Sequence, residues 1–369
     1  MSTISENMKI KLLDFKDEKR QQWEKDRKLY AVHFEVTPRC NFSCVHCYLR
    51  DHHQEEQLSY DRIIEILDIL YSKSILFITF TGGEIFSRQD FLDIYMYAKR
   101  KGFIIELFTN AYLITPHIIE ALAKYPPLLV DVSLYGSNDE TYQKVTGIKG
   151  AFSRVVDNCK LLVDAGVRVA LKSPVLTLTY NELPEMRRIG EQLGIPFRAS
   201  FELIPTIDND SSTKQYQVSS YQMLSYEFDD IISQKNIEIE REERLDMKPV
   251  NRQLVKPLFR CKVGLTSCII DYHGFLCPCM KFKHRGIKIS ADTFDIIWKE
   301  FGELTSMRAS SSYKCLTCDA YNYCDICPAE MESVFGNLEY IEKSFCKIAF
   351  ARKHFYDNNF DMDNALSSL

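Results

Sequence analysis

Short apolar runs alternate with amphipathic segments over most of the first two hundred residues. Continuous apolar runs are typical of parallel strands that are buried on both faces, whereas apolar residues three and four apart indicate helices. Strands alternating with helices predict a parallel βα array. Since a closed barrel of this kind has eight units, we expect an open, partial (β/α)6 barrel in the α/β class. The six strand-like runs lie at 30–36, 75–80, 103–109, 128–135, 167–175 and 197–204.

Capping residues mark the ends of the predicted helices. Ser59 and Thr115 stand just before two helical patterns, and their side chains suit the free N–H groups of a first helical turn. Gly102, Gly166 and Gly194 follow the last apolar residue of three other patterns. Glycine commonly ends helices because it adopts the left-handed conformation at no steric cost. These boundaries separate the helices from the strands on either side.

The remainder of the chain changes in character. Residues 205–260 are polar and charged, which favours a connector with some helix, and cysteines cluster beyond it. From about residue 351 we expect a helix that frays. The predicted organisation is an N-terminal charged helical segment (1–29), a partial barrel (30–205), a connector (206–260), a cysteine-rich domain (261–350) and a tail (351–369).

Composition narrows the class of protein. The 369 residues are 46% hydrophobic and carry a formal net charge of −5, so we expect neither nucleic acid nor an anionic membrane as partner. No apolar run reaches the length of a membrane span, and the charged N-terminus lacks a signal-peptide core, so we expect a cytoplasmic protein. Thirteen cysteines in a reducing compartment favour metal or iron–sulfur ligation over disulfides.

Three cysteines, Cys40, Cys44 and Cys47, follow the first predicted strand within eight residues. A four-iron, four-sulfur (4Fe–4S) cluster takes one ligand per iron, so three thiolates leave one iron open. An open metal position is where a substrate or cofactor binds, while structural sites are closed. The alternatives at this stage are a zinc site or scattered buried thiols.

The spacing CxxxCxxC after a strand resembles the radical S-adenosylmethionine (radical SAM) enzymes. The resemblance implies that the amine and carboxylate of SAM bind the open iron. It also implies reductive cleavage of SAM to a 5′-deoxyadenosyl radical, which abstracts hydrogen from a substrate. His46, just before the third cysteine, would contact the adenine.

A second motif follows the second predicted strand. Gly82, Gly83 and Glu84 match the GGE element of the same family, which implies that Glu84 accepts a hydrogen bond from the SAM ammonium. Glycine has no Cβ and lets the backbone approach a ligand closely. Alone, this triplet is more often an ordinary turn, so its position one βα unit after the cysteines is what makes it informative.

Polar residues also follow the third and fourth predicted strands. The resemblance implies that Asn110 and Ser133 contact the ribose or carboxylate of SAM, while the alternative for each is a local turn. An arginine common in the family about a dozen residues after that serine is missing, and Lys144 and Val145 stand near its place. All these residues fall at the carboxyl ends of strands, the end that carries the active site in βα barrels.

The C-terminal cysteines resemble the SPASM extension of radical SAM enzymes, which holds two auxiliary 4Fe–4S clusters. A zinc ribbon is the alternative, since paired CxxC motifs also suit tetrahedral zinc. The resemblance implies a first auxiliary cluster on Cys261, Cys279 and Cys327. It implies a second on Cys315, Cys318, Cys324 and Cys346.

Two departures and one spare thiol accompany this assignment. Cys324 and Cys327 are separated by two residues, where the family usually has three. The first auxiliary cluster lacks an evident fourth ligand, so one iron is open or it recruits Cys268 or Cys277. Cys159 lies in a predicted helix and is expected to be a buried, inert thiol.

The resemblance implies three 4Fe–4S clusters, SAM, and hydrogen abstraction from a ribosomally made peptide or protein that becomes crosslinked, oxidised or epimerised. One alternative is a small molecule or haem precursor as substrate, and another is a non-catalytic iron–sulfur or zinc protein. Cys279 is followed by Met280, where sulfatase-maturing relatives carry an aspartate, which argues against that branch.

Partners are the least determined part of the prediction. We expect a low-potential electron donor, a flavodoxin or ferredoxin. Only 39 residues precede Cys40, too few for the leader-binding module of many peptide maturases, so we expect either a separate leader-binding protein or recognition without a leader. The sequence names no catalytic acid or base. Polar residues near the expected site are Asp271, Tyr272 and His273 in the C-terminal block and Glu202 near the sixth strand.

Overall fold

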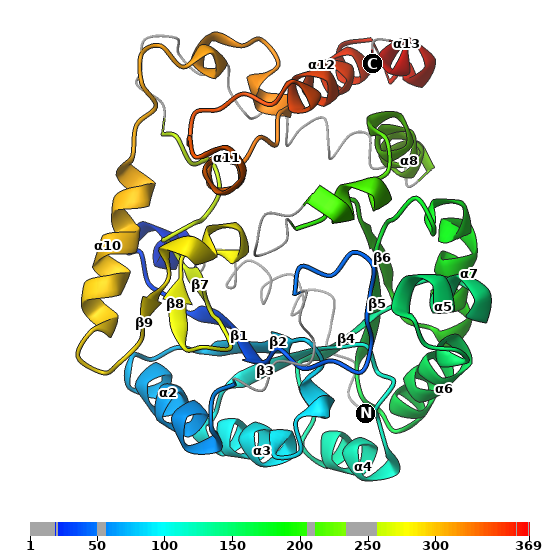
Figure 1. Cartoon of the computed structure of the whole chain (residues 1–369), viewed down its shortest axis with the longest axis vertical. Coiled ribbons are helices and arrows are strands. Elements are labelled where there is room, and N and C mark those ends of the chain that lie inside the picture. The colour runs from blue at the N-terminus through cyan, green and yellow to red at the C-terminus, as the bar shows by residue number, and fades with distance from the viewer. Residues whose placement is uncertain are drawn as a thin grey trace, which may run out of the picture.

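The computed structural model describes residues 19, 21–49, 57–204, 211–233, 257–358, 360–367 and 369. Six parallel strands pair in sequence order and curve into an open barrel with helices on the outside (Figure 1). The predicted partial barrel is therefore confirmed, with most of the strands shorter than their apolar runs. The strands are β1 (Ala31–Thr37), β2 (Phe77–Gly82), β3 (Ile104–Thr109), β4 (Leu129–Ser133), β5 (Val169–Pro174) and β6 (Phe197–Ser200).

The helices that cover the sheet end where their caps predict. Ser59 and Thr115 accept hydrogen bonds from the first turns of α2 and α4. Gly102 and Gly194 end α3 and α7 in the left-handed conformation, with φ of 90° and 67°. One helix, α5, lies in a segment for which the sequence analysis predicted no helix. The bounds are α2 (Tyr60–Ser72), α3 (Phe91–Lys101), α4 (Pro116–Lys124), α5 (Asp139–Thr146), α6 (Ala151–Asp164) and α7 (Leu183–Leu193).

The sheet does not stop at the barrel. Strand β7 (Ser267–Ile270) pairs in parallel with the far side of β1, and β8 (Phe275–Cys277) and β9 (Ile287–Lys288) extend it antiparallel, giving nine strands in all. The cysteine-rich region is therefore joined to the barrel through backbone hydrogen bonds to β1. This joint places the segment after β8, residues 278–281, against the interior of the barrel.

The rest of the C-terminal region builds a second, smaller core. It contains Phe259, Phe282 and Tyr313, with Cys279 and Cys327 packed against them. The helices and 3₁₀ turns of this region are η4 (Met280–Arg285), α10 (Phe294–Ser306), η5 (Lys314–Thr317), η6 (Tyr321–Tyr323), α11 (Pro328–Phe335), α12 (Lys343–Asp357) and α13 (Met362–Leu366).

The tail is ordered helix, so the expectation that it frays from about residue 351 is wrong for the described residues. Phe355 of α12 stacks on Phe228 of α8 (Ser220–Ser233), with ring centroids 3.9 Å apart. Arg352 of α12 also pairs with Glu227, at 2.8 Å. Burial of the aromatic pair holds α12 and α13 beside α8 (Figure 1). Sequence periodicity within the tail could not reveal a partner in the distant connector.

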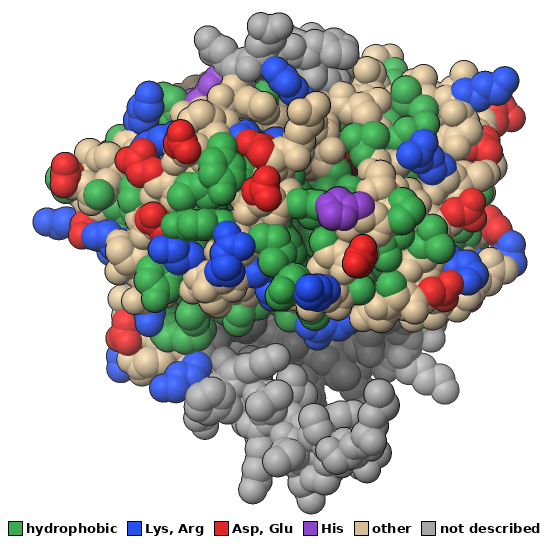
Figure 2. All heavy atoms as spheres, turned by 90° about the horizontal axis from the view of Figure 1, so that it is seen from below, with side chains coloured by type: hydrophobic (Ala, Val, Ile, Leu, Met, Phe, Trp, Pro, Cys, Tyr) green, Lys and Arg blue, Asp and Glu red, His purple; other side chains and the backbone are tan. Residues whose placement is uncertain are grey.

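The outer surface carries charges of both signs. Figure 2 shows one face of the molecule, on which basic and acidic side chains are interspersed with apolar ones. Within the described part of the chain, every helix is too short or too polar to cross a membrane.

Candidate functional site

A cavity of about 720 Å³ occupies the interior of the barrel. Its wall combines strand ends from the barrel with Cys279, Met280 and Lys281 from the C-terminal region. The topology thus brings together residues that lie more than two hundred positions apart. The predicted site residues that line it are Cys40, Cys44, His46, Cys47, Gly82, Gly83, Asn110 and Ser133.

The three thiols of the first motif are neighbours held in an apolar setting. Burial raises the pKa of Cys40 to about 12, with a further contribution from Glu84, and burial raises that of Cys47 to about 11. The Cys40 sulfur accepts hydrogen bonds from Phe42 N at 3.4 Å and Asn110 Nδ2 at 3.7 Å. Thiols with raised pKa values are protonated near neutrality, so metal binding there displaces protons and is favoured by higher pH.

The three thiols supply a donor set that fits a 4Fe–4S cluster. Such a cluster binds each thiolate through a different iron, and Cys40, Cys44 and Cys47 all line the same cavity. Three thiolates would therefore hold three irons and leave the fourth without a protein ligand.

Two buried polar atoms beside the thiols have no hydrogen-bond partner: His46 Nδ1 and Asn41 Nδ2. Buried polar groups in folded proteins are nearly always satisfied, so the unpaired Nδ1 of His46, which lines the cavity, fits a site built for a ligand. Burial lowers the pKa of His46 to about 4, so its ring is neutral at pH 7. Tyr135 lies against that ring, with centroids 5.4 Å apart, and also lines the cavity.

The glycines of the GGE motif pack against the backbone that leads into the first cysteine. A Cβ on Gly82, whose φ is 135°, would lie 2.2 Å from Thr37 O, and one on Gly83 would lie 2.3 Å from Arg39 O. Gly83 N also donates to Thr37 O, at 2.8 Å. The sequence predicted close approach of a ligand here; in the structure the close approach is to the protein's own backbone. These glycines therefore fix the cysteine loop against β2.

Glu84 lies behind the cavity wall. One carboxylate oxygen accepts from Thr109 Oγ1 at 2.7 Å and from Phe86 N at 3.1 Å, and the other accepts from Asn110 N at 2.7 Å. Burial raises the pKa of this carboxyl. In the structure Glu84 thus orients Asn110, while its predicted contact with the SAM ammonium stays a prediction.

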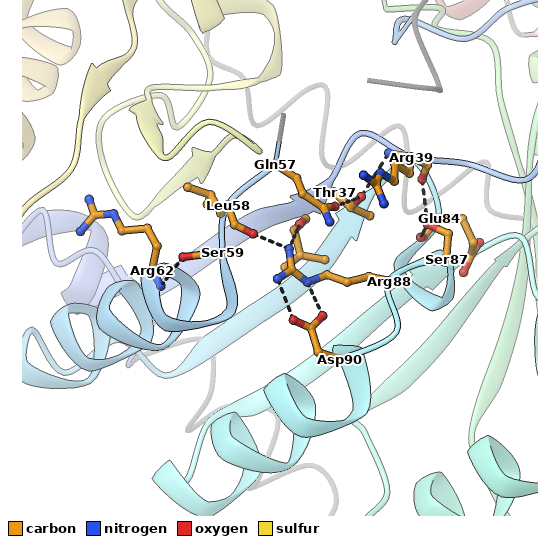
Figure 3. A network of polar contacts seen from close by, with 11 residues as sticks. Thr37, Arg39, Gln57, Leu58, Ser59, Arg62, Glu84, Ser87, Arg88 and Asp90 are labelled. Atoms are coloured by element: carbon orange, nitrogen blue, oxygen red, sulfur yellow. Dashed lines mark hydrogen bonds and ion pairs between the residues drawn. The ribbon is translucent and has the colours of Figure 1, made fainter. Parts of the chain in front are cut away.

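Arg88, which the sequence reasoning missed, ties three segments of the site together (Figure 3). Its guanidinium pairs with both oxygens of Asp90, at 2.6 and 2.9 Å, and donates to Val36 O at 3.1 Å and Leu58 O at 2.7 Å. It therefore holds the end of β1, the start of α2 and the turn η1 (Ile85–Ser87) together. An arginine four residues after a GGE motif was the available signal.

The cationic residues of the site differ from those expected. Lys144, near the place of the missing arginine, is exposed and pairs with Glu140 at 2.7 Å. Lys172 lines the cavity instead, aligned with Ser133 across the β4–β5 pair. Its ammonium lies 3.1 Å from the fully buried Asp131. Burial lowers the pKa of Lys172 to about 8, against the opposing effect of Asp131.

Several C-terminal thiols are close enough to influence one another's pKa, while their assignment to two clusters stays a prediction. Burial raises the pKa of Cys279 to about 11, and the neighbouring thiols of Cys327 and Cys261 raise it further. The second predicted group shows the same mutual influence: the thiols of Cys315 and Cys346 raise the pKa of Cys324 after burial, and the thiol of Cys318 does the same for Cys346.

The remaining thiols are separate from these groups or at their margin. Cys268 and Cys277 lie together on the β7–β8 hairpin, where burial and each other's proximity raise the pKa of Cys268. Cys277 also lies near Cys279. Cys159 is buried in the main core, as expected. Asp271 and His273 form the hairpin turn, in which Asp271 accepts from the backbone N of His273 at 3.0 Å.

Comparison with known proteins supports this architecture. Residues 34–189 match the model of the Radical SAM superfamily. An AdoMet-dependent heme synthase of Methanosarcina barkeri is 23% identical over 331 residues, which span 85% of this chain and 94% of that protein. The antilisterial bacteriocin subtilosin biosynthesis protein AlbA of Bacillus subtilis is 27% identical over 261 residues, which span 68% of this chain and 54% of AlbA.

Among solved structures, Streptococcus suis SuiB bound to its precursor peptide SuiA has a TM-score of 0.66 at 16% identity, covering 87% of this chain and 77% of SuiB. That likeness concerns the fold and extends through the C-terminal region. With the family match and the cavity geometry, it defines an open-barrel enzyme with a cysteine-rich extension. Residues 34–189 therefore form a radical SAM domain, and the predicted fold, a partial barrel followed by a cysteine-rich C-terminal region, is confirmed.

Proposed function

We propose that this radical SAM enzyme modifies a ribosomally made peptide or protein and uses three 4Fe–4S clusters. The SAM-binding cluster is held by Cys40, Cys44 and Cys47. The observation that carries the proposal is the single cavity lined both by these thiols and by Cys279. A substrate in that cavity would therefore lie within reach of both cluster-binding regions. The auxiliary clusters are held by Cys261, Cys279 and Cys327, and by Cys315, Cys318, Cys324 and Cys346.

When bound, the cluster and SAM supply a 5′-deoxyadenosyl radical that abstracts hydrogen from the substrate. The protein's own residues bind and orient SAM. His46 and Tyr135 flank the adenine, where a neutral imidazole and an aromatic ring suit stacking. Asn110 and Ser133 contact the ribose or carboxylate, and Lys172 is the cation that takes the place of the missing arginine. The largely apolar wall excludes water from the reacting atoms.

The peptide substrate is supported by two relatives. SuiB was solved with a precursor peptide bound, and AlbA serves bacteriocin biosynthesis. A haem precursor is the second candidate, because the heme synthase of Methanosarcina barkeri matches along a larger share of this chain. Both candidates use the same SAM site, so the substrate has to be decided by experiment.

The test compares the two substrate classes directly. Anaerobically reconstituted protein with SAM and a low-potential reductant is offered either a short peptide encoded beside its gene or an iron porphyrin bearing propionates. We expect the peptide to stimulate 5′-deoxyadenosine formation at least tenfold and to change in mass. Stimulation by the porphyrin alone would contradict the peptide assignment. That result would not affect the assignment of the SAM site.

The auxiliary clusters give a separate prediction. Wild-type protein should hold about twelve irons, four per cluster. Replacing Cys315, Cys318, Cys324 and Cys346 by alanine should lower this to about eight while SAM cleavage without substrate continues. Metal and acid-labile sulfide analyses check the result. Zinc bound at this site in place of iron and sulfide would refute the second auxiliary cluster.

Two partners complete the proposal. Radical chemistry of this class needs a low-potential electron donor, and a flavodoxin or ferredoxin fits that need. A separate leader-binding protein would present the peptide. Pull-down with the peptide and its neighbouring gene products tests the second partner.

A further inference from the structure

A charged side chain lies at the centre of the sheet, where apolar residues are the rule. Glu35 of β1 is fully buried, with an exposed fraction of 0%. Both of its carboxylate oxygens accept hydrogen bonds from Lys283 Nζ, at 2.6 and 2.7 Å. Tyr48 donates its hydroxyl to one of the same oxygens, at 2.6 Å. The carboxylate is thus held by one cation and one phenol.

These three residues join the two cysteine-bearing regions. Tyr48 directly follows Cys47, and Lys283 lies in η4, the turn that begins after Cys279. Glu35 follows Phe34, the last residue of β1 that pairs with β7, so its side chain faces the point where the cysteine-rich region meets the barrel. Lys283 Nζ also lies 4.8 Å from the centroid of the Tyr48 ring. The ion pair therefore sits between the cysteine loop and η4.

The energetics of such a pair need an explanation. A buried ion pair contributes little net stability, because the cost of removing both charges from water is large, and apolar residues of similar size are often as good or better. The β1–β7 strand pairing already attaches the two regions. In a dry interior, however, each charge acts strongly on its surroundings, because the effective dielectric constant is low. The surroundings here include the Cys47 thiol on the proposed cluster.

We propose that Glu35 and Lys283 are paired positioning residues that set the reduction potential of the cluster held by Cys40, Cys44 and Cys47. This inference rests on the proposed function, since it requires a cluster at those thiols. The two charges act in opposite directions. Reduction adds a negative charge to the cluster, so the Lys283 ammonium favours the reduced state and the Glu35 carboxylate opposes it.

The test is a potentiometric titration of the reconstituted holoenzyme, followed by the electron paramagnetic resonance (EPR) signal that responds to SAM. Lys283→Gln should lower the ratio of reduced to oxidised cluster at a fixed potential about tenfold, and Glu35→Gln should raise it about tenfold. For a one-electron couple, a tenfold change corresponds to about 59 mV. The double variant E35Q/K283Q should return the potential close to that of the wild type.

Shifts of opposite sign in the reduction potential distinguish an electrostatic effect of the ion pair from a purely structural role in holding the two regions together. If the pair only holds the two regions together, both single variants lose melting temperature and iron content, and any change in potential has the same sign in both. That outcome, or unchanged potentials in variants with full iron content, overturns the inference. The double variant keeps the test informative if one single variant folds poorly, because uncharged amides of matching size fill both positions.

Arg285 supplies a matched control. It lies two residues from Lys283 in η4, but it pairs with Glu332 at 2.5 Å and is not among the residues that line the cavity. Arg285→Gln should leave the potential of the SAM-responsive cluster unchanged, and an equal shift there would refute the special position of Lys283. A protein with no SAM-responsive signal at all would overturn the proposed function and this inference with it. Shifts of equal sign would overturn only the inference.

Discussion

Alanine at Cys40, Cys44 and Cys47 together reduces SAM cleavage to the background of the reductant alone. Three of the cysteines that line the cavity with Gly83, Asn110 and Ser133 lie on one loop, and these are the three thiols replaced here. Cys268 and Cys279, which belong to the C-terminal region, also line the cavity. Three thiolates hold three irons and leave the fourth iron open for SAM. Loss of the three thiolates therefore removes the whole cluster and, with it, the SAM site.

The measurement is 5′-deoxyadenosine formed per protein, together with iron and sulfide content. The triple variant should keep about eight of about twelve irons, because the auxiliary cysteines are untouched. Cys159→Ala is the matched control: it removes a buried core thiol and should leave iron content and SAM cleavage at wild-type levels. SAM cleavage that persists in the triple variant would show that the active cluster is bound elsewhere.

Alanine at Gly83 disrupts the site without touching a thiol. The added Cβ would lie 2.3 Å from Arg39 O and 2.5 Å from Pro38 O, both of them backbone atoms that have no free space to move into. We expect the cysteine loop to be pushed away from β2. Overpacking of this kind costs about 1–3 kcal/mol of unfolding free energy. We further expect SAM cleavage to fall at least tenfold, because Cys40 follows Arg39 directly.

Gly102→Ala is the control that distinguishes displacement of the cysteine loop from the general effect of replacing a glycine. Gly102 has a φ of 90°, and a Cβ there would meet nothing within 4 Å. Its replacement carries only the strain of a left-handed residue, about 1–2 kcal/mol, and lies far from the cavity lining. Thermal melts and SAM-cleavage rates of both variants make the comparison. Equal activity in the two would mean that the Gly83 contact does not position the cysteine loop.

Much of the barrel was predictable because its signals are local. The strands β1, β2, β4 and β5 are largely buried and read as apolar runs, and caps such as Ser59 and Gly102 mark helix ends. The grouping of the C-terminal thiols into two clusters rests only on resemblance to a family and stays a prediction. From spacing alone, a zinc ribbon is an equally valid interpretation of the cysteines from Cys315 to Cys327.

What the sequence could not supply depends on pairings between distant segments. Nothing in the run at Ser267–Ile270 indicates that it pairs with β1. Without that pairing, neither the Cys279 wall of the cavity nor the Glu35–Lys283 ion pair could be foreseen. Glu84 illustrates a different limit: the sequence shows a carboxylate just after β2, but whether a buried carboxylate faces a ligand or a neighbouring backbone N–H is decided by packing.

Addition of SAM to the reduced, oxygen-free protein, followed by EPR spectroscopy, examines the vacant iron itself. A variant that lacks the seven auxiliary cysteines but keeps Cys40, Cys44 and Cys47 isolates the signal of one cluster. We predict that SAM changes the g values and line shape of that signal, because its amine and carboxylate bind the iron that no thiolate holds. A spectrum that stays the same at saturating SAM would contradict the assignment of this cavity as a radical SAM site.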